Sequence, residues 1–245
     1  MSSNFNVKIK ECAVLTSNEV HIWSASLSED ENDIDYFASL LSEDERERAS
    51  SFRFPRDQHR YTISRGILRS LLAEYLGEAP RTIEITYGLW GKPCLSQEKS
   101  LHFNLSHSGD YVLYALALDY EVGIDLEYID RNLEIEDMAK HIFSAPELEF
   151  WGDVKSEERT ECFFKLRVCK EAFLKAIGKG WLENEKTKGF EKSCVLKKIS
   201  NNGLLKDKVT YPYSFKCVPG YASALFVDGA SLCPLHYNWP QSTFK

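Results

Sequence analysis

The stretch VGIDLEYID, residues 122–130, is an apolar, strand-like run that carries two acids, Asp125 and Glu127. Side chains alternate between the two faces of a strand, so these acids share one face while Ile124 and Leu126 point to the other. Two carboxylates on one face repel each other unless positive charge lies between them. A divalent cation with oxygen ligands would supply that charge, and so would a pair of Lys or Arg side chains. The third interpretation is a solvated strand face.

The segment SEERTECFFKLRVCKEAFLKAIGKG, residues 156–180, is predicted to form the longest helix. Its Glu171 and Lys175 are four residues apart and lie on one helix face, a spacing that also fits a simple ion pair. A third carboxylate near Asp125 and Glu127 would complete a site for a hard cation. Mg²⁺ takes few carboxylates and completes its shell with water and phosphate oxygens, so this set indicates a phosphate-bearing substrate.

A basic region precedes these acids in the chain. Residues 46–69 hold seven arginines against two acids, and Arg is the side chain best suited to phosphate oxygens. Lys92 in the turn GKP and His107 in NLSHSG would add donors from loops. A lone His is more often structural, and a stripe of arginines also fits a solvated surface.

Helices and strands are predicted on both sides of residue 120. We therefore expect an α+β fold with an N-terminal lobe, residues 1–120, and a C-terminal lobe, residues 121–245. Ser42, followed three residues later by Glu45, predicts a capping box at a helix start. The other predicted elements are strands at 19–27, 193–199, 213–218 and 221–227, two adjacent strands within 110–129, a helix at 59–77, and one or two short helices within 133–152.

The composition argues against several classes of function. The 245 residues are 43% apolar, and 37 acids against 30 bases give a net charge of −7, which disfavours nucleic-acid binding through a general basic field. No apolar run approaches the roughly 18 residues of a membrane span, and the N-terminus lacks a signal-peptide core. Seven cysteines without a C-x-x-C pair predict reduced thiols in the cytoplasm.

Four motifs in order, GKP, FNLSHS, VGIDLE and FFKLRVCKEAFLKAIGKG, resemble those of the Sfp-type 4'-phosphopantetheinyl transferases, and most of all the cyanobacterial members. The resemblance implies a pseudo-twofold monomer of two similar α/β lobes, with coenzyme A and Mg²⁺, or alternatively Mn²⁺, in the cleft between them. It also implies transfer of the 4'-phosphopantetheine group of coenzyme A to a serine of an acyl or peptidyl carrier protein, with release of 3',5'-ADP.

The same resemblance assigns roles to individual residues. Asp125, Glu127 and Glu171 match the metal-binding acids. Glu147, in FSAPELEF, matches the acid proposed as general base, and Lys175 matches the lysine near the pyrophosphate, so Glu147, Glu171 and Lys175 are the expected catalytic residues. The positions that match coenzyme A contacts are Arg48, Arg60, Lys92, Ser106, His107 and Lys175.

One position departs from the family pattern, because Arg167 stands in LRVCKEA where the family usually has Trp. Arg167 lies four residues before Glu171, so we expect an ion pair on one helix face that competes with the metal for Glu171. Two rival functions therefore stay open. They are a non-catalytic paralogue that binds coenzyme A or carrier protein, and a Mg²⁺-dependent phosphodiesterase or nuclease.

Overall fold

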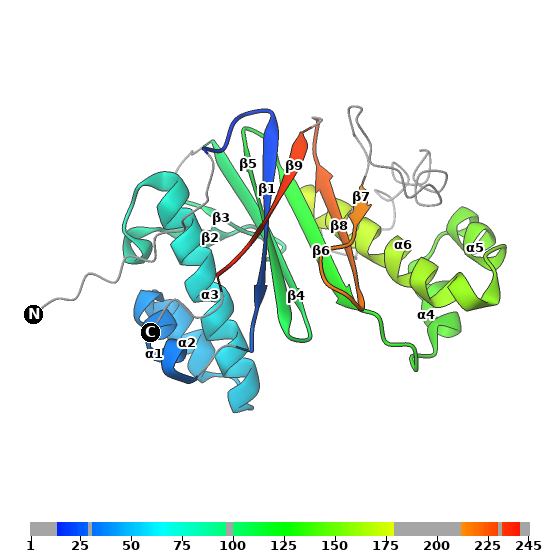
Figure 1. Ribbon diagram of the computed structural model, residues 1–245, viewed down its shortest axis with the longest axis horizontal. Coiled ribbons are helices and arrows are strands. Elements are labelled where there is room, and N and C mark those ends of the chain that lie inside the picture. The colour runs from blue at the N-terminus through cyan, green and yellow to red at the C-terminus, as the bar shows by residue number, and fades with distance from the viewer. Residues whose placement is uncertain (1–13, 29–30, 97–99, 179–211, 230–231, 241–245) are drawn as a thin grey trace, which may run out of the picture.

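The chain forms two lobes, each a small sheet covered on its outer side by helices (Figure 1). The computed structural model describes residues 14–28, 31–96, 100–178, 212–229 and 232–240. The expected α+β architecture of paired lobes is confirmed. The strand predicted at 193–199 lies outside the described residues.

The first lobe is built on a four-stranded sheet of order β4-β5-β1-β9. Strand β9 pairs in parallel with β1, so a segment from the second half of the chain completes the sheet of the first lobe. The division at residue 120 describes the two halves of the sequence and stays a prediction. The elements of this lobe are β1 (Glu19–Ser26), α1 (Glu31–Leu40), α2 (Glu43–Ser50), α3 (Pro55–Leu76), the 3₁₀ turn η1 (Pro80–Thr82), the small pair β2 (Ile85–Tyr87) and β3 (Pro93–Leu95), β4 (Leu101–Ser108), β5 (Tyr111–Leu118) and β9 (Cys233–Asn238).

The second lobe is built on an antiparallel sheet of order β6-β8-β7, covered by α6, with two shorter helices packed on α6 (Figure 1). Two short helices occupy the segment 133–152, as the sequence predicted, and the second begins beside Pro146. The elements are β6 (Val122–Tyr128), α4 (Ile135–Ile142), α5 (Ala145–Gly152), α6 (Ser156–Ala176), β7 (Tyr213–Phe215) and β8 (Tyr221–Val227).

The two sheets meet where edge strand β4 lies against edge strand β6. Side chains of alternate β4 residues contact β6 along this junction, which we call the seam. Asn104 Oδ1 accepts a hydrogen bond of 2.9 Å from the Ile124 amide, and Ser108 Oγ accepts one of 2.9 Å from the Tyr128 amide. Ser106 lies between them on the same face of β4. The consecutive strands β5 and β6 therefore belong to different sheets.

Helix α6 packs directly on β6 because Gly123 has no side chain. A Cβ at Gly123 would lie 2.0 Å from the Ala172 carbonyl oxygen and 2.4 Å from the Ala176 amide nitrogen. The alanines are the small residues on the facing side of the helix. This close approach sets Lys175 beside the strand that carries the two acids.

We expect Gly123→Ala to lower the free energy of unfolding by about 3 kcal/mol or more, because the added methyl group would collide with helix backbone that has no room to shift. Thermal and urea denaturation measure this. Gly152→Ala is the matched control, since nothing lies within 4 Å of a Cβ at that position. Equal stability of the two variants would contradict the tight packing of α6 on β6.

Candidate active site

Asp125 is the centre of a charged cluster at the seam. Its Oδ1 lies 2.6 Å from Lys175 Nζ and accepts a hydrogen bond of 2.8 Å from Ser106 Oγ. Lys175 Nζ also donates to Ser106 Oγ at 2.9 Å, so the three side chains form a closed triangle. Asp125 is 4% exposed. The structure thus joins three predicted site residues, from β4, β6 and α6, across both lobes.

Glu127 lies two residues further along β6 and has its own basic partner. Arg167 Nη2 is 2.9 Å from Glu127 Oε1, and Ser108 Oγ donates to Glu127 Oε2 at 3.3 Å. The partner predicted from the sequence was Glu171, on the same helix as Arg167, and that pairing stays a prediction. The contact with Glu127 runs from helix to strand, which residue spacing along one helix does not reveal. Each strand acid therefore has a cationic partner from α6.

The acid pair offers oxygen donors to a hard cation, although it is not a complete metal site. Within the part of the chain that the structure describes, Asp125 Oδ2 is buried and has no hydrogen-bond partner. An orphaned carboxylate oxygen of this kind fits Mg²⁺ or Mn²⁺. Across the same residues, no three His, Cys, Asp or Glu side chains gather closely enough to hold a metal ion, so Asp125, Glu127 and Glu171 are not preassembled.

A cavity of about 470 Å³ on the first lobe gathers basic side chains from three elements. Arg48 of α2, Arg60 and Arg65 of α3, and His107 of β4 all line it. Partial desolvation lowers the pKa of His107, and the positive charges of Lys175, Arg60 and Arg65 lower it further. These effects identify a locally positive region that favours an anion. Three of the predicted coenzyme A contacts therefore share one cavity, with the Asp125 cluster next to it.

Arg65 lines this cavity, but nothing in the sequence singles it out from the seven arginines of residues 46–69. Its guanidinium carbon lies 5.5 Å from the centre of the Tyr61 ring and 5.7 Å from that of Tyr87, which orients the side chain. Among the described residues, its Nη1 is buried and has no hydrogen-bond partner. An unsatisfied guanidinium donor is well suited to a phosphate oxygen. Neither the aromatic contacts nor the orphaned donor has a signature in local sequence.

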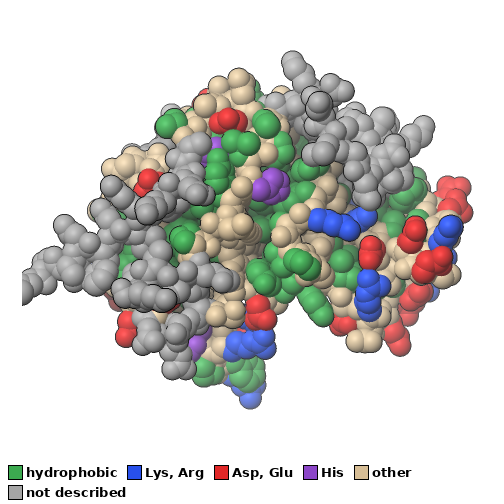
Figure 2. Space-filling view, viewed as in Figure 1, with side chains coloured by type: hydrophobic (Ala, Val, Ile, Leu, Met, Phe, Trp, Pro, Cys, Tyr) green, Lys and Arg blue, Asp and Glu red, His purple; other side chains and the backbone are tan. Residues whose placement is uncertain are grey.

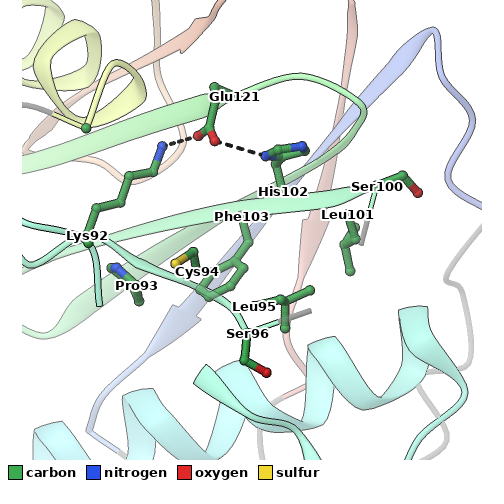
Figure 3. Close-up of a pocket in the computed structure, with 12 residues that line it drawn as sticks. Lys92, Pro93, Cys94, Leu95, Ser96, Ser100, Leu101, His102, Phe103 and Glu121 are labelled. Carbon is green, nitrogen blue, oxygen red and sulfur yellow. Dashed lines mark hydrogen bonds and ion pairs between the residues drawn. The ribbon is translucent and has the colours of Figure 1, made fainter. Parts of the chain in front are cut away.

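Lys92 is not among the residues that line this cavity, and it borders a second one of about 600 Å³ (Figure 3). Its Nζ donates to Glu121 Oε2 at 2.5 Å, to the Val122 carbonyl at 3.2 Å and to the Ala176 carbonyl at 3.0 Å. Hydrogen bonds from His102 and Lys92 lower the pKa of Glu121 to about 2. Lys92 thus ties the GKP turn to β6 and α6, while its neighbour Pro93 lines both cavities.

The side chain of Glu147 is buried, and its contacts stabilise the packing of helix α5. Its Oε2 accepts a hydrogen bond of 2.7 Å from the Ser144 amide, which forms a capping box at the start of α5. Lys170 Nζ lies 3.0 Å from the same oxygen and also donates to the Ile142 carbonyl at 2.8 Å. These contacts hold α5 on α6, and they do not bring Glu147 into the Asp125 cluster.

The first lobe contains the same arrangement, which supports a structural role for Glu147. The predicted capping box of Ser42 and Glu45 is confirmed at the start of α2. Glu45 is buried against Arg69 of the following long helix, with a separation of 2.5 Å, and Arg69 donates to the backbone of the turn after that helix. Both lobes thus pair a capping-box glutamate with a buried base.

We expect Glu147→Gln to cost about 3 kcal/mol of folding stability, because it leaves Lys170 charged and buried without its partner. The double variant Glu147→Gln, Lys170→Met should regain much of this loss, since no unpaired charge remains. Chemical denaturation of the single and double variants measures both effects. A stable Glu147→Gln protein with a large loss of kcat would instead support the general-base role that the resemblance implies.

Comparison with known proteins agrees with this geometry. Residues 23–118 match the family model described as the N-terminal region of 4'-phosphopantetheinyl transferase, and residues 121–219 match that of the 4'-phosphopantetheinyl transferase superfamily. The 4'-phosphopantetheinyl transferase HetI of Nostoc sp. is 41% identical over 169 residues, which are 68% of this chain and 71% of that protein. The protein slr0495 of Synechocystis sp. is 38% identical over 59% of each chain, and the 4'-phosphopantetheinyl transferase Sfp of Bacillus subtilis is 32% identical over 63% of this chain and 66% of that protein.

The chain therefore belongs to the 4'-phosphopantetheinyl transferase superfamily, a class of transferase enzymes. Two of these relatives are cyanobacterial, which agrees with the resemblance of the four sequence motifs to cyanobacterial members. The superfamily uses coenzyme A as a substrate. Among the described residues, no helix combines the length and the apolar character needed to cross a lipid bilayer.

Proposed function

We propose that this enzyme transfers the 4'-phosphopantetheine group of coenzyme A to a serine of an acyl or peptidyl carrier protein and releases 3',5'-ADP. The observation that carries the proposal is the triangle of Asp125, Lys175 and Ser106 at the seam. It places a lysine and a carboxylate, one oxygen of which has no hydrogen-bond partner among the described residues, beside a cavity lined by basic side chains. That combination suits a substrate with several phosphates.

Mg²⁺, or alternatively Mn²⁺, is the ion we propose for this site, held by Asp125, Glu127 and Glu171. When bound, it would stabilise negative charge on the pyrophosphate oxygens. Lys175 would add a fixed positive charge beside the same oxygens, and its bond to Ser106 holds it in position before the substrate arrives. We assign no proton transfer to Glu147, because Lys170 and the capping box already engage it.

The cavity of the first lobe is the proposed site for the nucleotide phosphates of coenzyme A. Arg48, Arg60, Arg65 and His107 line it. Arg60 is held by an ion pair with Asp110, whereas Arg65 keeps a buried donor without a partner in the described residues. Phosphate oxygens would satisfy that donor. Lys92, in contrast, would act by positioning the GKP turn.

The protein is proposed to act as a cytoplasmic monomer on carrier proteins, without a nucleic-acid or membrane partner. On the face shown in Figure 2, the basic side chains over the second lobe lie among acidic ones and form no continuous basic field. The net charge of −7 argues against the nuclease alternative. The non-catalytic alternative draws support from one contact, the pairing of Arg167 with Glu127.

Purified protein incubated with coenzyme A, Mg²⁺ and an apo carrier protein should add one phosphopantetheine group to the carrier, which mass spectrometry detects. Asp125→Asn should slow this transfer at least about a hundredfold, because it removes a charge that the metal and Lys175 both need. Glu149→Gln, an exposed acid on α5, is the control and should keep full activity. Coenzyme A binding without any mass gain, on acyl and peptidyl carriers alike, would establish the non-catalytic alternative.

Arg65→Met should weaken coenzyme A binding about tenfold or more, because it removes a charge-assisted hydrogen bond to phosphate. Calorimetric titration measures the dissociation constant. Arg56→Met is the control, since Arg56 lies on the same helix, is 70% exposed and does not line the cavity. Titration with 3'-dephospho-coenzyme A shows which phosphate Arg65 contacts. If Arg65→Met weakens the binding of intact coenzyme A alone, Arg65 contacts the 3'-phosphate. Equal affinities of Arg65→Met and Arg56→Met would exclude Arg65 from the site.

A further inference from the structure

We propose that Arg167 is a resident counter-cation of the acid pair, which lowers the affinity of the site for a divalent metal ion and stabilises the protein when no metal is bound. This inference rests on the metal site of the proposed function. It concerns how this chain departs from its family at one position, where Arg replaces the usual Trp. It makes Arg167 a positioning and affinity-setting residue and not a group that touches the reacting atoms.

The balance of charge at the seam is the first argument. Asp125 is paired with Lys175 at 2.6 Å, and Glu127 is paired with Arg167 at 2.9 Å. Each of the two strand acids thus has a positive partner from α6 before any metal binds. The repulsion that a pair of strand carboxylates creates is therefore already relieved by the protein itself.

The position of Arg167 makes its competition with a metal direct. Its guanidinium contacts Glu127 Oε1, and Glu127 is one of the acids that would hold the ion. The side chains of Arg167 and Glu127 are 25% and 26% exposed, so their attraction is screened less than that of a fully exposed pair. A metal ion must therefore displace the guanidinium or bind beside its positive charge, and either process weakens binding.

The surroundings of Arg167 indicate that this contact is not an optimised structural ion pair. Among the described residues, Arg167 Nε is buried and makes no hydrogen bond. Lys170, on the adjacent buried face of α6, instead has two acceptors within 3.0 Å. Leaving a buried guanidinium donor unsatisfied costs stability, so a role in packing alone gives a poor account of Arg at this position.

Arg167→Met provides the test, with metal binding measured on the protein without coenzyme A or carrier. Removing the guanidinium should tighten Mn²⁺ binding at least about tenfold, as followed by electron paramagnetic resonance of the free ion, because a neighbouring charge shifts ion affinities by this order. Without metal, the variant should melt at a lower temperature than the wild-type protein, since the two acids then repel each other. Mg²⁺ should restore that melting temperature, while the wild-type protein should respond little.

Two further variants separate this effect from a general loss of an ion pair. Arg131→Met removes an exposed arginine that also lies 2.9 Å from its acid, Glu161, and it should change neither metal affinity nor the response to Mg²⁺. Glu127→Gln added to Arg167→Met should abolish the gain in Mn²⁺ affinity. Arg167→Lys should restore part of the wild-type Mn²⁺ affinity and melting temperature, because it keeps the positive charge but lacks the planar guanidinium group.

The outcomes distinguish failure of this inference from failure of the proposed function. Equal Mn²⁺ affinity of Arg167→Met and the wild-type protein, in an enzyme whose carrier modification requires Mg²⁺, overturns the role of Arg167 and leaves the proposed function intact. Absence of metal binding to both proteins, together with carrier modification that needs no divalent ion, removes the proposed metal site and the inference with it. A gain of the same size in Arg131→Met also overturns the inference.

Discussion

The seam between β4 and β6 is the constraint on which the rest of the structure depends. An edge strand exposes backbone groups that must be satisfied, and here side chains of β4 satisfy groups of β6 from the neighbouring sheet. Asn104 and Ser108 hold the backbone, and Ser106 between them holds the Asp125 carboxylate. The contacts that join the two lobes and the contact that positions Asp125 therefore come from alternate residues of one strand, β4.

Two features of the fold bring the helix charges to the seam. Because Gly123 has no side chain, the backbone of α6 packs directly against the backbone of β6. This close packing brings Lys175 into contact with Asp125. Behind the helix, the buried pair of Glu147 and Lys170 fixes α5 against it. Glu45 and Arg69 repeat that pair in the first lobe, so related packing supports both halves of the seam.

Local rules predicted the long helices, several strands, the capping box at Ser42 and the shared face of the strand acids, because each depends on residues a few positions apart. They did not predict α1, β2, β3 or β9. Nor did they predict that β9 returns to pair with β1, or that β4 of one sheet lies against β6 of the other. Those pairings are set by packing between distant segments. The contact between Glu147 and Lys170 could not be predicted for the same reason. The two residues are 23 positions apart, and nothing in FSAPELEF indicates this lysine as the partner.

The two acids share a strand face because the protein itself supplies a cationic partner for each of them. The sequence left open a metal ion or a pair of bases, and the structure shows Lys175 and Arg167 in contact with Asp125 and Glu127. The two answers are compatible, because a carboxylate oxygen of Asp125 still lacks a partner in the described residues. A site whose two strand acids already have cationic partners, and which still offers an oxygen to a cation, can fold without metal. Its affinity for metal then depends on how firmly Lys175 and Arg167 hold those acids.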